Sequence, residues 1–306
     1  MTATFDNSPW GTFAPRGLER LVLAITRRMP DNWLGLRIAM IFRRIVMSNI
    51  GQRGIDTTLW GMRVRLYPRR NGCEKNALFT PQMYDVMERT AVAKAIDRHP
   101  PQRGFTFVDI GANVGLHTLF AVAHGGARVR VLAIEPQPGI LDRLRFNLAS
   151  NPAARVEVIP LAVADRDCNA TLVINDSDSG GTHLDKTDTA TGPGRTKVAC
   201  KPLTEILADA GIDAIDALKI DVEGAEDISL GPFLRDAPQS LLPRLIVIED
   251  TSGQWTIDLF ARLAGRGYRE AARSRQNLAF ELAFVSARPR ESGDPVLGPG
   301  FPLARE

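Results

Sequence analysis

Five apolar, β-rich runs follow one another along the chain, and helical stretches separate several of them. The runs are FTFVDI (105–110), VRVLAIE (129–135), VEVIPLAV (156–163), ALKIDV (217–222) and RLIVIED (244–250). The clearest helical stretches lie at 114–124 and 139–150. Strands that are apolar on both faces and alternate with helices are typical of a parallel sheet covered on both sides. A late run at 277–286 predicts a last strand that pairs antiparallel.

The first of these runs leads into VDIGANVGLHT (108–118), where two glycines and an asparagine interrupt the apolar pattern. Gly and Asn tolerate backbone angles that other residues resist, so this stretch predicts a tight turn from a buried strand into a helix. In an open parallel sheet, ligands bind beyond the carboxyl ends of the strands. We therefore expect a ligand at Gly111, Asn113 and Gly115, with Asp109 serving the turn or an ammonium group of that ligand.

An acid, Glu135, ends the next run. A carboxylate at this position accepts hydrogen bonds from two ribose hydroxyls, which indicates an adenosine-bearing cofactor. A dinucleotide turn needs G-x-G-x-x-G, but Asn113 and Leu116 occupy the second and third glycine positions. S-adenosylmethionine has no phosphate, so the turn favours it over NAD. A turn needed only for folding, with Glu135 facing water, stays open as the structural alternative.

Composition and charge narrow the class of protein. A net charge of +3 over 306 residues gives no sign of a nucleic-acid partner. No apolar run reaches the roughly 20 residues that a membrane span needs, and the first residues lack the pattern of a secretory signal. Three widely spaced cysteines show no metal-ligand spacing and fit a reducing compartment. These features predict a cytoplasmic protein.

The segment before the first run is more basic than the rest. Residues 18–50 mix large apolar side chains with arginine, which predicts one or two amphipathic helices. Such helices either lie on an anionic membrane surface or pack on the main domain with their arginines in water. Residues 57–66 predict a strand or hairpin. Residues 71–88 are either a lid, with Glu74, Tyr84 or Glu88 reaching the cofactor, or a plain brace.

Taken together, these blocks resemble the FkbM-type methyltransferases, which are S-adenosylmethionine-dependent enzymes. The matching blocks are VDIGANVGLHT at 108, LAIEPQP at 132, RFNLASN at 145, VIPLAVAD at 158, LKIDVEGAED at 218 and LIVIED at 245. The resemblance spans about 70–285. It implies an α/β fold of the Rossmann-like class I type, with a mostly parallel seven-stranded sheet, an antiparallel last strand and helices on both faces.

The sequence predicts a domain organisation of three parts. They are an N-terminal helical extension with a possible lid (1–103), a cofactor-binding methyltransferase domain (104–287) and a disordered tail (288–306). The tail is rich in proline, glycine and charge, a composition typical of disorder.

The resemblance also implies a cofactor site. Its expected members are Asp109, Gly111, Ala112, Asn113, Gly115, Glu135, Pro136, Ala162 and Asp165. Asp165 and Ala162 are expected beside the adenine, and Asp221 and Glu223 near the sulfonium at the mouth of the fourth strand. The family's usual serine-leucine after a glycine pair is replaced by the stretch 180–184, within a loop (176–197) where acceptor specificity is expected to reside.

Methyl transfer to oxygen needs an aligned nucleophile and a base that takes its proton. The catalytic candidates are Asp221, Glu223 and His183. Further acids and bases near the strand ends are Glu249, Asp250 and His117. Lys219 is expected to form a structural ion pair. Each has a plain alternative as a solvated or packing residue. Asp221 and Glu223, together with Asp250, alternatively gather a divalent ion, since hard cations prefer carboxylate oxygens.

The expected function is O-methylation of a hydroxyl on a sugar, glycan or secondary metabolite. The alternatives are an NAD-linked oxidoreductase and a non-catalytic nucleotide-binding module that uses the basic N-terminus. Methylation of nucleic-acid bases is disfavoured, because the fourth strand ends in DVEG without an Asn-Pro-Pro-aromatic motif. Expected partners are a small-molecule or glycan acceptor, no nucleic acid, and a membrane surface at the N-terminal helices. The acceptor's identity and the oligomeric state are left open.

Overall fold

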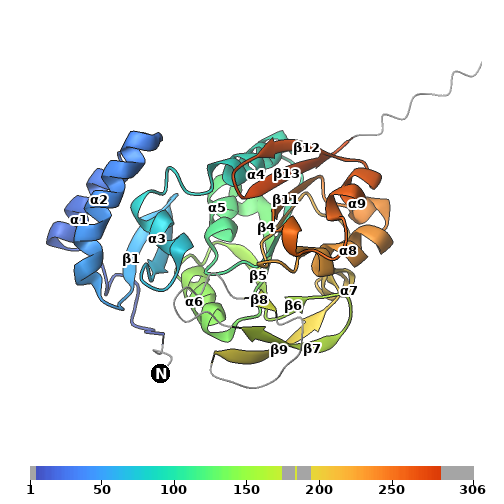
Figure 1. Cartoon of the computed structure of the whole chain (residues 1–306), viewed down its shortest axis with the longest axis horizontal. Coiled ribbons are helices and arrows are strands. Elements are labelled where there is room, and N and C mark those ends of the chain that lie inside the picture. The colour runs from blue at the N-terminus through green and yellow to red at the C-terminus, as the bar shows by residue number, and fades with distance from the viewer. Residues whose placement is uncertain (1–4, 174–182, 185–193, 284–306) are drawn as a thin grey trace, which may run out of the picture.

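A seven-stranded sheet forms the centre of the protein in a computed structural model that describes residues 5–173, 183–184 and 194–283 (Figure 1). Its strand order is β12-β13-β11-β10-β3-β4-β5. The strands are β3 (Phe105–Ile110), β4 (Val129–Ile134), β5 (Arg155–Ile159), β10 (Ala217–Ile220), β11 (Leu245–Glu249), β12 (Tyr268–Arg273) and β13 (Asn277–Leu282). Neighbours from β5 to β11 run parallel, whereas β13 pairs antiparallel with both β11 and β12. The predicted fold class is confirmed.

Helices cover both faces of this sheet. One face packs on α4 (Val86–Arg98), α5 (Leu116–Gly125) and α6 (Pro138–Ala149), and the other on α7 (Leu203–Asp209), α8 (Glu226–Asp236) and α9 (Leu259–Gly265). Successive side chains of a strand point to opposite faces, so Phe107 packs with α4 and α5 while Val108 packs with α7 and α8. This double burial explains why the runs are apolar at nearly every position.

Two details of the sheet differ from the sequence-based prediction. The run 156–163, expected as one strand, is divided at Pro160, which has no amide hydrogen for the strand ladder. β5 ends before this proline, and β6 (Ala162–Val163) joins a different sheet. The strand β12 was not predicted, because its sequence YREAAR is mostly exposed and polar. An edge position tolerates such side chains. Because β12 occupies the edge of the sheet, β13 lies second from it.

A second sheet of four strands inserts between β5 and α7. Its order is β6-β9-β7-β8, with β7 (Cys168–Val173), β8 (His183–Leu184) and β9 (Arg195–Lys201). Cys168 lies opposite Cys200 in the β7–β9 pairing, although 31 residues separate them along the chain. Burial, with the neighbouring Cys168, raises the pKa of Cys200 to about 12, so its thiol stays protonated at neutral pH.

The N-terminal region contains the predicted amphipathic helices. We call the pair α1 (Gly17–Thr26) and α2 (Trp33–Ile50) the helical hairpin. It is followed by the antiparallel strands β1 (Ile55–Leu59) and β2 (Met62–Leu66) and by α3 (Gly72–Phe79). Val22 and Val46 pack into one apolar cluster with residues of β1, β2 and α3. In Figure 1 these elements lie between the helical hairpin and the rest of the molecule.

A buried ion pair fixes the chain that precedes the helical hairpin. Arg65 is fully buried and donates to both carboxylate oxygens of Asp56, at 2.6 and 2.9 Å. It also donates to backbone carbonyls in the segment 6–9, and Asp56 accepts from the amides of Gly11 and Phe13. A buried charge needs such complete pairing. The segment 6–13 is therefore bound tightly to strands β1 and β2.

Candidate active site

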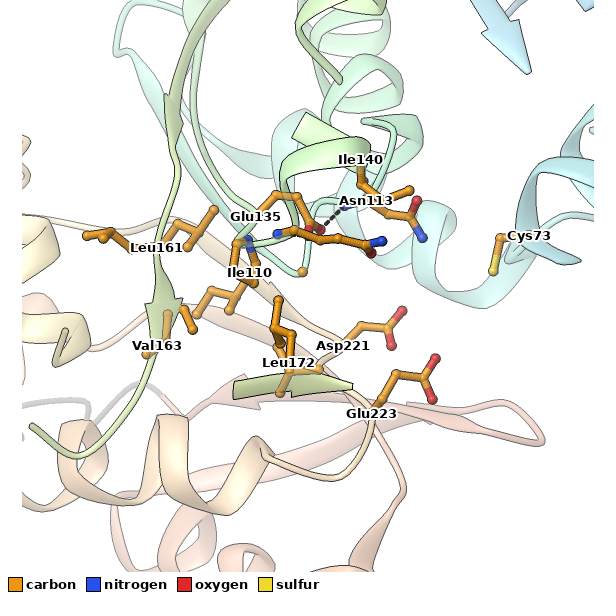
Figure 2. A pocket seen from close by; sticks show the side chains of 16 residues that line it. Cys73, Ile110, Asn113, Glu135, Ile140, Leu161, Val163, Leu172, Asp221 and Glu223 are labelled. Carbon is orange, nitrogen blue, oxygen red and sulfur yellow. Dashed lines mark hydrogen bonds between the residues drawn. The ribbon is translucent and has the colours of Figure 1, made fainter. Parts of the chain in front are cut away.

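A cavity opens at the carboxyl ends of β3, β4 and β10 (Figure 2). At one end its wall is apolar, with Leu161 and Val163 from the segment after β5. At the other end lie the carboxylates of Asp221 and Glu223, opposite Cys73. The cavity thus has an apolar end, a middle that contains the glycine turn, and an acidic end.

The glycine turn adopts the backbone conformation that its sequence predicts. Gly111, Asn113 and Gly115 have φ values of 73°, 51° and 87°. These angles lie in the left-handed region, which Gly adopts freely and Asn more readily than most residues. A Cβ atom on Gly111 would lie 1.9 Å from the carbonyl oxygen of Asp221. The loops that follow β3 and β10 therefore touch at Gly111, and no larger residue fits there.

Glu135 lies against this turn at the end of β4. Its carboxylate accepts hydrogen bonds from the amides of Asn113 and Gln137, both at 2.9 Å, and the residue is 7% exposed. Burial raises the pKa of Glu135 to about 7, although these two amides oppose the rise; the nearby carboxylates of Asp109 and Asp221 add to it. The acid and the turn thus form one rim of the cavity.

The raised pKa of Glu135 predicts that affinity for an adenosine ligand depends on pH. The ionised carboxylate is the better acceptor for ribose hydroxyls, and with a pKa of about 7 its fraction falls as pH drops from 8 to 6. We expect S-adenosylhomocysteine, the demethylated cofactor, to bind roughly five- to tenfold more weakly at pH 6 than at pH 8. Isothermal titration calorimetry measures this ratio. The variant Glu135→Gln should show no such dependence, and an equal dependence in both proteins would contradict the assignment.

Not every expected cofactor residue reaches the cavity. The wall includes Gly111, Asn113, Glu135, Pro136 and Ala162. Ala112 and Gly115 belong to the turn without lining the cavity. Asp109 is fully buried and accepts a hydrogen bond from the Thr118 hydroxyl of α5 at 2.6 Å, so it holds the helix against the strand.

Asp165, expected beside the adenine, lies outside the cavity wall. Its side chain is 50% exposed and pairs with Arg166 at 3.6 Å. The apolar neighbours Leu161 and Val163 occupy the wall where this acid was expected. The division of the predicted strand at Pro160 explains the difference, because it turns the chain toward the second sheet before Asp165.

Lys219 pairs with one of the carboxylates at the acidic end of the cavity. It is 5% exposed, and its Nζ lies 3.1 Å from Oδ2 of Asp221. Burial acts to lower the pKa of Lys219, but the carboxylates of Asp221 and Asp109 outweigh it and raise the pKa. The expected structural ion pair is present, and it places a permanent positive charge directly behind Asp221.

The loop DVEG owes its shape to Glu226, which was not among the expected site residues. Glu226 is fully buried and accepts from the amides of Val222 and Gly224, at 3.0 and 3.3 Å. Glu223 has a φ of 54°, a left-handed conformation that this anchoring holds in place. The block LKIDVEGAED, one of those that carry the family resemblance, thus encodes a loop that carries Asp221 and Glu223 into the site. Glu226 itself is structural.

Three acids gather at this end of the cavity. Carboxylate oxygens of Asp221, Glu223 and Glu249 lie within 4.8 Å of one another. Burial raises the pKa of Glu249 to about 8, and the charges of Asp221 and Glu223 add to the rise. Asp250, expected to join an ion site with Asp221, lies outside the cluster and pairs with Arg273 at 3.5 Å instead. Exposed acids often gather without an ion, so the cluster alone does not define a metal site.

The crowding at Glu249 predicts a pH-dependent effect on stability. A carboxylate whose pKa is raised in the folded state lowers stability as pH climbs from about 4.5 through 8. Glu249→Gln removes that charge, so we expect its melting temperature to exceed the parent's by about 2–5 °C at pH 8.5 and to match it near pH 5. Differential scanning fluorimetry measures both. Glu157→Gln, which changes an exposed acid, serves as the control; an equal gain at both pH values would contradict this explanation.

His117 pairs with an acid at the start of α4. Its Nε2 lies 2.9 Å from Oδ2 of Asp85, and the Tyr84 ring lies against the imidazole with centroids 5.9 Å apart. Burial acts to raise the pKa of Asp85, but His117 and the charge of Lys219 lower it. The other histidine candidate, His183, has its backbone in β8, and its side chain lies outside the described residues.

The segment 71–88 packs directly on the glycine turn. The side-chain amide of Asn71 donates to Oδ1 of Asn113 at 3.2 Å. Glu74 is buried in an ion pair with Arg143, and Glu88 accepts from the Ser274 hydroxyl at 2.9 Å. These partners hold both glutamates away from the cavity wall, whereas Cys73 of the same segment lines it. The lid and the brace both stay predictions.

Some wall residues were not among the expected site residues. Gln137 follows Glu135 within the block LAIEPQP, so its place beside the acid was predictable. Leu172 belongs to the second sheet, whose strands gave no distinct pattern. Cys73 has no metal-ligand spacing to mark it in the sequence, yet it lines the acidic end.

The fold and this cavity define a Rossmann-like class I methyltransferase. The sheet order places the glycine turn and Glu135 at one rim, beyond the carboxyl ends of the parallel strands, where open α/β sheets bind their ligands. The family described as "Methyltransferase FkbM domain" matches residues 109–270, which is more than half of the chain. The chain belongs to this family.

Relatives of known name match only part of the chain. The AMB antimetabolite synthetase AmbE of Pseudomonas aeruginosa is 29% identical over 177 residues, covering 46% of this chain and 8% of that protein. The methyltransferase sdnD of Sordaria araneosa is 29% identical over 177 residues, covering 49% of this chain and 63% of that protein. The chain thus spans less than two thirds of either relative.

Solved structures show similarity at low identity. The precorrin-6y C5,15-methyltransferase of Geobacter metallireducens has a TM-score of 0.39 at 15% identity, covering 68% of this chain and 90% of that one. The METTL16 methyltransferase domain has a TM-score of 0.41 at 14% identity, covering 65% and 68%.

Proposed function

We propose that this protein is an S-adenosylmethionine-dependent methyltransferase that methylates a hydroxyl oxygen of a sugar, glycan or secondary metabolite. The observation that carries the proposal is the hydrogen bond between Glu135 and the amide of Asn113, which unites a ribose-type acid and the glycine turn in one cavity. The name of one relative, a methyltransferase, agrees with methyl transfer, and the name of the other, an antimetabolite synthetase, agrees with a small-molecule acceptor.

The cavity suits each part of S-adenosylmethionine. Ile134, Leu161 and Val163 offer an apolar wall for the adenine. Glu135 is positioned to accept hydrogen bonds from the ribose hydroxyls. Gly111 lets the loop after β10 approach the turn, because any side chain there would collide with the backbone of Asp221. The acidic end matches the positive charge of the sulfonium and ammonium groups. No divalent ion is part of the proposal.

NAD fits the same site poorly. A diphosphate binds the free amides at the start of a helix. Here the side chain of Asn113 already accepts from the amide of Val114 at 2.9 Å. Leu116, where a dinucleotide turn has its third glycine, is the first residue of α5 and is buried. The oxidoreductase alternative therefore lacks a phosphate site at this turn.

The bound cofactor supplies an electrophilic methyl group, and the protein positions the acceptor and removes its proton. Asp221 lies at the acidic end of the cavity with its side chain 37% exposed, so an incoming hydroxyl can reach it. The ammonium of Lys219 donates to Oδ2 of Asp221 and orients the carboxylate. We assign to Asp221 the acceptance of the hydroxyl proton, with Glu223 beside it to bind the acceptor.

A thermal-shift comparison tests the cofactor assignment. We expect S-adenosylhomocysteine to stabilise the protein and NAD to leave its melting temperature unchanged. Selective stabilisation by NAD would favour the oxidoreductase, and no shift with either would favour a non-catalytic module. Metabolite and glycan profiles of cells with and without the gene then identify the acceptor as a species that gains the mass of one methyl group.

We place this activity in the cytoplasm, consistent with three cysteines that form no disulfide.

A further inference from the structure

The helical hairpin has an unusual outer surface. Among the described residues, eight large apolar side chains are markedly exposed, and seven of them belong to the helical hairpin. These seven are Leu18, Leu21, Trp33, Leu34, Leu36, Ile41 and Ile45. Trp33 is 69% exposed and Ile41 is 61% exposed. Single exposed apolar residues need no explanation, but a concentration of this kind indicates an interaction site.

The exposed apolar residues of α2 form a second face, separate from its packed one. At 3.6 residues per turn, Leu34, Ile41 and Ile45 fall on one side of the helix. The buried positions Ala39 and Val46 fall on the opposite side, where Val46 packs in one cluster with residues of β1 and β2. A helix that only packs on its own domain needs one apolar stripe. The second stripe therefore faces a partner outside this domain.

Charge identifies that partner. In the helical hairpin and its connecting residues (16–50), the exposed charged side chains are Arg16, Arg20, Arg28, Arg37, Arg44 and a single acid, Asp31. Arg37 lies over the Trp33 ring, 5.3 Å from its centroid. Arginine interleaved with tryptophan, leucine and isoleucine on one helical surface suits an anionic lipid interface. A second copy of the chain would bring like charges together.

We propose that the helical hairpin lies on an anionic membrane surface through this outer face. Exposed apolar side chains would enter the headgroup region, and the arginines would contact lipid phosphates. The described part of the chain contains no helix long and apolar enough to cross a bilayer, so the contact is peripheral. Figure 1 places the helical hairpin at one end of the molecule, away from the central sheet, where a flat surface can meet it.

Vesicle sedimentation with the full chain tests the proposal. We expect binding to vesicles that contain phosphatidylglycerol, and at least tenfold weaker binding to pure phosphatidylcholine. Raising the salt concentration should weaken the interaction, since exposed charges are screened. Absence of binding to either vesicle would overturn the proposal.

Two sets of variants locate the contact. Arg37→Gln with Arg44→Gln should weaken binding about twenty-fivefold, at about fivefold for each arginine near the surface. Arg103→Gln with Arg155→Gln removes the same charge from exposed positions outside the helical hairpin, and should change binding less than twofold. Leu34→Ser, Ile41→Ser and Ile45→Ser combined should weaken it at least tenfold, whereas Val86→Ser should have little effect.

The remaining outcomes also decide the question. Equal losses from both arginine pairs would mean attraction by net charge alone, and would overturn the assignment to the helical hairpin. A dimer in light scattering that the triple serine variant abolishes would instead identify a self-association face. Circular dichroism melting checks each variant. If the triple variant does not fold, the two arginine pairs decide by themselves.

Discussion

Replacing Asp221 with asparagine should lower methyl transfer about a hundredfold or more, while changing the affinity for S-adenosylhomocysteine less than about threefold. A positioned general base contributes roughly a hundredfold to ten-thousandfold to a reaction rate. Asparagine keeps the size of the side chain but cannot take the proton of the acceptor hydroxyl. Lys219 is expected to retain its hydrogen bond through the amide oxygen, so the loop that shapes the cofactor cavity should persist.

Two measurements separate the chemical role of Asp221 from a binding role. Calorimetry with S-adenosylhomocysteine gives the cofactor affinity, and the methylated product formed in a deletion strain that carries each variant gene gives the activity. Asp209→Asn, which alters an exposed acid paired with Lys201, serves as the matched control. Equal losses of affinity and activity would place Asp221 in the cofactor site.

Replacing Glu135 with alanine should weaken S-adenosylhomocysteine binding on the order of a hundredfold. Hydrogen bonds to a charged group stabilise by about 1.5 kcal/mol or more each, and two ribose hydroxyls are expected to donate to this carboxylate. The substitution also leaves the amides of Asn113 and Gln137 without their present acceptor, which should loosen the glycine turn.

Calorimetry at pH 8 is the appropriate measurement, because Glu135 is then mostly ionised. Glu157→Ala removes an exposed acid of β5 and should leave the affinity unchanged. Glu135→Gln should fall between the parent protein and the alanine variant, since its amide oxygen can still accept one hydrogen bond. An unchanged affinity for Glu135→Ala would remove the ribose assignment and, with it, the main support for the cofactor.

The strands and the glycine turn were predictable because the sequence encodes them locally. A strand buried on both faces must be apolar at nearly every position, as in FTFVDI and RLIVIED. The left-handed backbone angles at Gly111 and Asn113 restrict which residue types can occupy these positions, so the amino-acid sequence alone predicts the turn. Glu135 was recognisable from its place at the end of the following strand.

Only the tertiary structure decided which distant groups become neighbours. It places Glu249, rather than Asp250, beside Asp221, and it sets Cys168 opposite Cys200 in a sheet that the sequence did not reveal. It also pairs Glu74 with Arg143 and Glu88 with Ser274, outside the wall of the cavity that the lid alternative would have them reach. Backbone angles and apolar periodicity depend on a few adjacent residues, and the sequence determines them. Contacts between segments far apart depend on how all the layers pack together, and these came only from the folded chain.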